Sequence, residues 1–158
     1  MFTEEEFNNL VKTYMDTVFR LALNYVRCSY TADDITQNVF IKLYRSNKDF
    51  ESKDHIRNWL IKVTVNECKK VFLSPLRKVA PIEEYMETIP FPTQEHSDLF
   101  YAVMALPPKY RVVIYLHYYE GYSTEEISKL LGIPAATVRT QLKRGREILK
   151  TNLEDSHV

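Results

Sequence analysis

The stretch YSTEEISKLLGIPAATVRTQLKRGREILK, from Tyr122 to Lys150, contains the signals for two helices and a turn between them. Ser123 followed by Glu126 matches a capping box, which predicts the start of a short helix. Gly132 is able to end that helix in a left-handed conformation, and Pro134 suits the first turn of the next helix. The stretch therefore predicts a helix-turn-helix.

The two helices of this stretch have distinct faces on a helical wheel. The predicted buried positions are Ile127, Leu130 and Leu131 on the first helix and Val138, Leu142 and Leu149 on the second, where Gly145 permits close approach. The opposite side of the second helix carries Arg139, Thr140, Lys143 and Arg144, with the small Ala136. This face suits a helix that enters a DNA major groove, and a solvated basic face on a helical hairpin is the alternative.

Four tyrosines stand just before the helix-turn-helix, and they allow two readings. They are Tyr115, Tyr118, Tyr119 and Tyr122. A base-stacking surface is one reading, but a helix that packs under the helix pair is the favoured one.

Helical spacing continues through the rest of the chain, as in Phe7, Leu10, Val11, Tyr14 and Val18. Thr31 is predicted as an N-cap, with Asp33 and Asp34 in the first turn, followed by an apolar stripe of Ile35, Val39 and Leu43. A further helix is predicted through Ile56, Leu60 and Val63. The fold class is therefore all-α.

The segment from Leu73 to about Ser97 contains four prolines, which exclude one continuous helix. It divides the chain into two small helical domains, residues 1–72 and 97–158, joined by an extended linker over residues 73–96.

Composition narrows the function class. With 45% hydrophobic and 27% charged residues the chain suits a soluble globular protein, and neither a membrane span nor a signal peptide is expected from its apolar runs and its acidic first residues. A cytoplasmic location is expected. Cys28 and Cys68 are predicted as small buried thiols, and no metal spacing, phosphate loop or acid/base constellation predicts an enzyme or a cofactor.

Charge is distributed unevenly, although the formal net charge is zero. Residues 129–150 contain six cations and one acid, so a local phosphate-binding face remains credible on a neutral chain.

The first domain carries two polar faces. Asp34, Gln37, Asn38 and Ile41 fall on one side of their helix, which is either a docking surface for a protein or a solvated face. A later helix aligns Asn58, Lys62, Asn66 and Lys69, with Trp59 at the border and Lys70 close by. Cations and asparagines beside an aromatic suit nucleic-acid contact, although Trp59 is read first as a core residue. The polar loop RSNKDFESKDHIRN before this helix, with Phe50, could frame a pocket for an extruded base.

Three motifs together resemble the short, extracytoplasmic-function group of bacterial sigma factors. They are ADDITQNVFIKLY, WLIKVTVNECKK and LPPKYRVVIYLHYYEGYSTEEISKLLGIPAATVRTQLKRGR, in the order expected, and the resemblance runs from about Phe7 to Leu153. It implies that the first domain is sigma region 2 and the second is region 4. The implied function is to give RNA polymerase core its promoter specificity and to help open promoters, without catalysis.

The resemblance also implies three sets of site residues. The docking stripe, which would bind the polymerase clamp, is Asp34, Gln37, Asn38 and Ile41. The melting face, which would read and open the −10 element, is Asn47, Lys48, Phe50, Trp59, Lys62, Asn66, Lys69 and Lys70. The recognition face, which would enter the major groove at the −35 element, is Ala136, Thr137, Arg139, Thr140, Gln141, Lys143 and Arg144.

Three positions depart from the family's pattern. Members commonly have an acidic residue at Asn38, a glycine or asparagine at Ala136 and an arginine at Gln141. The departures put the charge part of the polymerase contact and the preferred −35 sequence in question.

The family also implies partners: the clamp and flap of RNA polymerase core, promoter DNA, and an anti-sigma factor that is often membrane-bound. The chain itself is expected to be a monomer when free and not to insert into a membrane. Two other functions stay open, a helix-turn-helix regulator that acts without core polymerase and a helical module whose basic face binds acidic protein.

Overall fold

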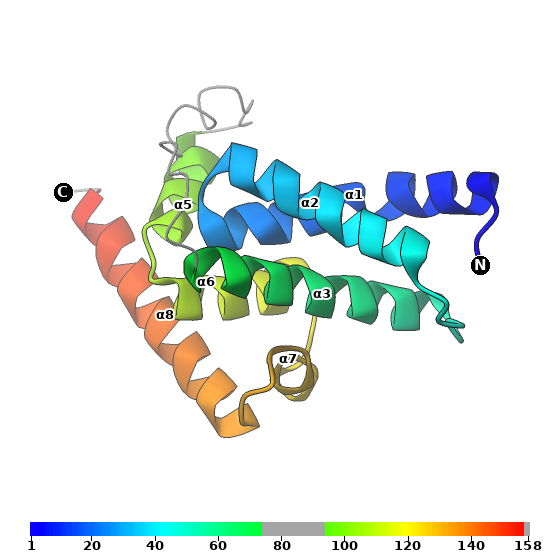
Figure 1. Cartoon of the computed structure of the whole chain (residues 1–158). Coiled ribbons are helices and arrows are strands. Elements are labelled where there is room, and N and C mark those ends of the chain that lie inside the picture. Colours follow the sequence, from blue (N-terminus) through cyan, green and yellow to red (C-terminus); the bar gives the residue numbers. More distant parts are fainter. Residues whose placement is uncertain (74–93, 157–158) are drawn as a thin grey trace. The chain divides into compact units, whose positions relative to one another are not determined.

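The computed structural model describes residues 1–73 and 94–156. The chain forms two compact units, Met1–Ile82 and Glu83–Val158 (Figure 1). Every regular element in the described ranges is a helix, which confirms the all-α prediction. Most of the predicted linker, residues 74–93, lies outside the described residues, and helix α5 begins at Gln94, within the predicted end of the linker.

The first unit consists of three helices packed side by side: α1 (Glu4–Val26), α2 (Ser29–Arg45) and α3 (Lys53–Leu73) (Figure 1). A capping box starts α1, because the Thr3 hydroxyl accepts from Glu6 N at 3.1 Å and Glu6 Oε2 accepts from Thr3 N at 2.9 Å. Arg27 ends α1 in a left-handed conformation, with φ 57°, and its N–H donates to the Leu23 carbonyl.

Helix α2 begins earlier than the sequence predicted. Cys28 is its N-cap and no side chain caps it, so the prediction of Thr31 as N-cap was wrong. Asp33 and Asp34 consequently lie beyond the first turn. Cys28 and Ala32 are buried, and Ala32 N donates to the Cys28 carbonyl at 2.8 Å. The packing of these two small residues therefore determines where the helix starts, and it outweighs the local capping signal at Thr31.

The core of the first unit combines the inner faces of all three helices. Its central members, each at most 4% exposed, are Val18, Leu21, Leu23, Ile35, Val39, Leu43, Leu60, Ile61 and Val65. The predicted stripe on α2 is confirmed. On α3 only Leu60 of the predicted stripe is buried, and Ile56 and Val63 are half-buried.

Both cysteines are free and buried, as predicted. Burial raises the pKa of the Cys68 thiol, so it stays protonated at neutral pH and acts as a small apolar residue.

The second unit contains α5 (Gln94–Met104), α6 (Pro108–Ile114), a π-helical turn η1 (Tyr115–Tyr119), α7 (Thr124–Leu131) and α8 (Ala135–Ser156). Arg111 is only 2% exposed and fixes the corner between α5 and α6. Its guanidinium donates to the carbonyls of Met104 at 3.2 Å and Leu106 at 2.9 Å. A buried cation is thereby satisfied by backbone oxygens that the end of a helix leaves without partners.

The helix-turn-helix forms as predicted. The capping box of Ser123 and Glu126 starts α7, and Gly132 ends it with φ 69°. Ile127 and Leu130 are buried, and Leu131 is half-buried. Pro134 directly precedes α8, and its carbonyl accepts from Val138 N at 3.1 Å.

Helix α8 packs through one face on α6. Val138 and Leu142 are buried as predicted, whereas Leu149 is half-buried. A Cβ atom added at Gly145 would come within 2.8 Å of Ile114 Cδ1. The absence of a side chain there allows the two helices to approach closely.

No described helix is long and apolar enough to span a membrane.

Candidate functional site

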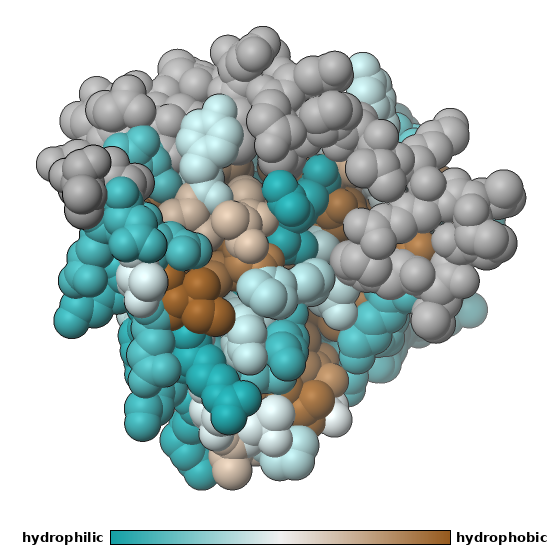
Figure 2. Space-filling view, turned by 90° about the vertical axis from the view of Figure 1, so that its left-hand side faces the viewer, coloured by the Kyte–Doolittle hydropathy of each residue, from teal (hydrophilic) through white to brown (hydrophobic). Residues whose placement is uncertain are grey.

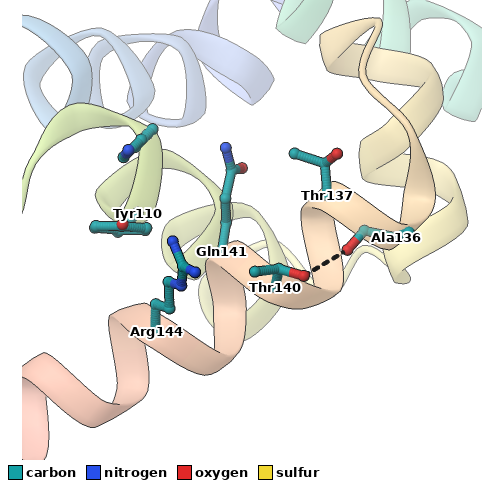
Figure 3. Close-up of a pocket in the computed structure, with 7 residues that line it drawn as sticks. Tyr110, Ala136, Thr137, Thr140, Gln141 and Arg144 are labelled. Atoms are coloured by element: carbon teal, nitrogen blue, oxygen red, sulfur yellow. Dashed lines mark hydrogen bonds between the residues drawn. The ribbon is translucent and has the colours of Figure 1, made fainter.

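The recognition face lies on the first three turns of α8. Ala136, Arg139, Thr140, Lys143 and Arg144 are exposed, and Thr137 and Gln141 are half-buried. The Thr140 hydroxyl donates to the Ala136 carbonyl at 3.0 Å, which keeps its oxygen lone pairs accessible (Figure 3). The face therefore offers cations, a hydroxyl and an amide on a rigid helix, the groups that read base edges and phosphates.

Arg139 meets one acidic side chain of the preceding helix. Its Nη1 lies 3.9 Å from Glu125 Oε1, and the two side chains are 58% and 69% exposed. The pKa of Glu125 is lowered mainly by the backbone N–H of the same residue and by the Thr124 hydroxyl, with a smaller contribution from Arg139. Such a long, exposed ion pair holds the guanidinium weakly, so Arg139 is accessible to another anion.

A pocket of about 330 Å³ opens on the recognition face (Figure 3). All residues of that face except Arg139 and Lys143 line it, together with Lys109 and Tyr110 of α6. Sequence reasoning missed these last two residues because helix packing alone brings α6 next to α8.

The four tyrosines of the helix-turn-helix region divide into two pairs. Tyr115 and Tyr122 are buried, as a packing role requires, but Tyr118 and Tyr119 are 56% and 68% exposed. The Tyr118 hydroxyl accepts from Arg146 Nη1 at 3.1 Å. The packing prediction was therefore right for one pair and wrong for the other.

An aromatic cluster forms the centre of the melting face. The Phe50 ring lies edge-on to Trp59, at 5.7 Å between centroids, and to His55, at 5.1 Å. Phe2 stacks on Phe50 at 6.1 Å. Trp59 is half-buried, so it is a border residue and not a core residue as first read.

The loop that carries Phe50 is shorter than predicted. It covers residues 46–52, because α3 already begins at Lys53. Asn47 and Lys48 are exposed on it, and Lys48 N donates to Ser46 Oγ at 3.1 Å.

The cations on α3 differ in their surroundings. Lys62, Asn66 and Lys69 are exposed on the outer side of the helix. Lys70 is also exposed, but its Nζ lies 3.1 Å from Glu67 Oε1, and Lys42 of α2 pairs with the same oxygen. Lys70 thus forms part of a contact between α2 and α3.

Glu67 is the acceptor in this contact, and its side chain is only 11% exposed. Burial by itself would raise the pKa of Glu67, but hydrogen bonds from Lys42 and Lys70 outweigh that effect and lower it. Sequence reasoning missed Glu67, since its partner on α2 is 25 residues away.

The docking stripe is exposed along α2. Asp34, Gln37 and Asn38 face solvent, and Ile41 is 46% exposed. Tyr44 extends the surface at 60% exposure, with its ring edge-on to Phe7 at 5.2 Å. One exposed apolar side chain among polar ones occurs on solvated faces as well as on docking surfaces, so exposure alone does not decide between the two. On the side shown in Figure 2, apolar residues are exposed in small patches among hydrophilic ones.

Two family models match the chain. The model of sigma-70 region 2 matches residues 10–74, and the model of sigma-70 region 4 matches residues 97–149. The two matches together cover most of the chain, in the order that the sequence predicted.

Curated relatives carry the same family name. The chain is 31% identical over 163 residues to the ECF RNA polymerase sigma factor SigE of Mycolicibacterium smegmatis, covering 92% of this chain and 61% of that protein. It is 27% identical over 175 residues to the ECF RNA polymerase sigma factor SigW of Bacillus subtilis, covering 96% of this chain and 91% of that protein. The chain therefore spans about three fifths of the first relative and about nine tenths of the second.

Two solved structures have the same fold. The sigma factor RpoE of Bartonella quintana, in complex with the anti-sigma factor NepR, matches with a TM-score of 0.70 at 18% identity, covering 95% of this chain and 98% of that one. CnrH, in complex with the cytosolic domain of CnrY, matches with a TM-score of 0.69 at 19% identity, covering 97% and 90%.

Proposed function

Because this chain belongs to the sigma-70 family, in its extracytoplasmic-function (ECF) group, we propose that it binds RNA polymerase core and directs initiation at a specific set of promoters. One observation carries this proposal: both sigma regions occur in order in one chain, and each presents exposed polar and cationic side chains on a rigid helix. The protein would recognise −35 and −10 elements and promote melting, with no catalysis of its own.

The recognition face would read the −35 element. Arg139 and Lys143 are exposed at the start of α8, where a recognition helix meets base edges. A bidentate contact from Arg139 to a guanine would contribute about 1–3 kcal/mol of discrimination. Gln141 lines the pocket beside α6. Because it stands where the family commonly has an arginine, the recognition face has one cation fewer to contact DNA.

The melting face would read and open the −10 element. Lys62, Asn66 and Lys69 offer donors to the backbone of a single strand, and the half-buried rings of Phe50 and Trp59 offer surfaces for an unstacked base. Trapping such a base must offset an unstacking cost of a few kcal/mol. Asn47 and Lys48 would approach the same strand from the loop.

The docking stripe would contact the polymerase clamp, and the second unit would contact the flap. Asn38 lacks the charge common at this position, so the apolar contact of Ile41 carries more of the interaction. An anti-sigma factor is a further proposed partner, since the sigma factor RpoE has this fold and was solved in complex with the anti-sigma factor NepR. The free protein would be a cytoplasmic monomer.

Run-off transcription tests this function. Purified core polymerase and the full chain are combined with DNA fragments from upstream of the chain's own gene. We expect a discrete transcript that depends on the protein, and loss of both transcript and comigration with core polymerase for the double variant Asp34→Ala, Gln37→Ala. Unchanged comigration of the double variant would exclude the clamp assignment. The absence of both transcript and comigration for the wild type would favour a regulator that acts without core polymerase.

A further inference from the structure

The pocket between α6 and α8 contains two residues that none of the predicted site sets includes. Lys109 and Tyr110 stand at the start of α6 and line, together with Gln141 and Arg144 of α8, a space of about 330 Å³. Figure 3 shows Tyr110 beside Arg144. Lys109 and Tyr110 are some 30 residues away in the sequence, yet they share one cavity with the recognition face.

The lining of this pocket has the chemistry of an anion site. Lys109 and Arg144 supply two positive charges, Tyr110 and Thr140 supply hydroxyl groups, and Gln141 supplies an amide. No carboxylate is among the lining residues. Paired cations with neutral donors are the groups that proteins use to bind phosphate.

Contacts inside the pocket hold these groups in place before any ligand arrives. The Tyr110 side chain is only 9% exposed, so its ring is fixed between α6 and α8. Arg144 lines the same pocket wall and is the main cause that lowers the pKa of Tyr110, and Lys109 Nζ lies 5.0 Å from the centre of the Tyr110 ring. Both cations therefore lie beside one largely buried aromatic side chain, in one pocket wall.

The position of the pocket indicates which phosphate it would bind. A helix in the major groove lies between the two DNA backbones, so residues that flank it meet phosphates while its exposed face meets base edges. Ala136 and Thr140 belong both to the recognition face and to the pocket wall. The pocket consequently opens at the border of the surface that would enter the groove.

We propose that Lys109, Tyr110 and Arg144 form a subsite for one backbone phosphate of the −35 DNA. Lys109 is the cation that contacts the phosphate, and Tyr110 is a positioning residue that holds Arg144. This inference rests on the proposed function and extends the interface from α8 to α6.

The salt dependence of promoter binding tests the role of Lys109. Holoenzyme reconstituted from core polymerase and the full chain is titrated onto the upstream DNA fragment between about 50 and 200 mM salt, the range over which phosphate contacts lose affinity. We expect Lys109→Gln to weaken binding and to reduce the slope of log K against log salt by about 1. Lys109→Arg should restore the slope, and Lys12→Gln, at an exposed lysine of α1 that belongs to none of the proposed faces, is the matched control that leaves it unchanged.

The outcomes separate this subsite from the proposed function. An unchanged slope for Lys109→Gln, while Arg139→Ala still weakens binding, would overturn the subsite and leave the sigma function intact. A wild-type chain that forms no holoenzyme would overturn both. Inorganic phosphate distinguishes the source of the ligand: saturable competition at low millimolar concentration, lost in Lys109→Gln, would mean a free-phosphate site and would overturn the DNA assignment.

A double-mutant cycle tests the positioning role of Tyr110. Tyr110→Phe keeps the ring but removes the hydroxyl, the group through which Arg144 would act on Tyr110 in the pocket. We expect it to weaken promoter binding, and Arg144→Ala to cost less affinity in the Tyr110→Phe background than in the wild type. Additive losses would show that the two residues act independently and would overturn this role.

Discussion

Helices α3 and α8 are nearly equal in length, and each has one buried side and one cationic side, but their charges have different surroundings. On α3, Lys70 pairs with Glu67, which also pairs with Lys42 of α2. On α8, Arg139 meets an acid only at 3.9 Å and Lys143 is exposed. The comparison indicates that Lys70 on α3 contributes to folding, whereas Arg139 and Lys143 on α8 are left for a ligand, and apolar packing holds that helix.

The largest effect is expected from the apolar side of α8. Leu142 is 2% exposed, so Leu142→Ala removes buried methyl groups and leaves a cavity, which should lower the free energy of unfolding by about 2–5 kcal/mol. Denaturant unfolding of the full chain measures this, together with hydrogen exchange of the α8 amides. The half-buried Leu131 is the control, and Leu131→Ala should cost less. A loss for Leu142→Ala as small as that for Leu131→Ala would mean that apolar packing does not hold α8.

Arg139→Ala should separate binding from folding. We expect promoter affinity of the reconstituted holoenzyme to fall by about 1–3 kcal/mol, because a base contact is lost. The unfolding midpoint should not move, since the ion pair to Glu125 is long and exposed. Arg146→Ala, which removes a contact to Tyr118 outside the recognition face, is the matched control. A shifted midpoint for Arg139→Ala would show that α8 also uses its charges for stability.

On α3, Glu67→Gln should lower the stability of the fold, the property that Arg139→Ala on α8 is expected to leave unchanged. The two lysine heads remain partly hydrated, so we expect a loss of only about 1 kcal/mol in unfolding free energy. The sign with pH follows from the lowered pKa of Glu67 in the folded chain: its contribution is present above the ordinary value of 4.5 and disappears as pH falls below that value. Unfolding measured from pH 6 down to acid should therefore show wild type and Glu67→Gln converging. Parallel curves would exclude the carboxylate as the cause.

The sequence predicted local features of the helix-turn-helix well, because their causes lie within a few residues of one another. The Ser123–Glu126 box and the left-handed Gly132 need no tertiary information. Thr31 failed as an N-cap because buried Cys28 and Ala32 set the start of α2 by packing. Local signals are thus overruled where a helix end lies in the core.

For the candidate site, the sequence predicted which face of each single helix is exposed. The docking stripe and most of the recognition face are exposed where helical spacing placed them. The sequence did not indicate the roles of Glu67, Lys109 and Tyr110, because each of these residues contacts or faces a second helix. The spacing of residues within one helix cannot predict a contact between two helices. The order and exposure of faces can therefore be read from sequence, but the partners of individual charges cannot.

The smallest effect is expected at Glu125, and it tests the α8 side of the comparison most directly. Glu125 is exposed and its carboxylate stands near Arg139 without holding it, so Glu125→Gln should leave the unfolding midpoint of the full chain unchanged. DNA affinity should rise slightly at low salt, because an acidic group that repels phosphate is removed and Arg139 is released, and the gain should vanish as salt screens the charges. Promoter binding of the holoenzyme at two salt concentrations measures the gain in affinity and its loss with salt, and denaturant unfolding measures the midpoint. A decrease in affinity would instead mean that Glu125 orients Arg139 for its base contact, and α8 would then depend on a charge pair as α3 does.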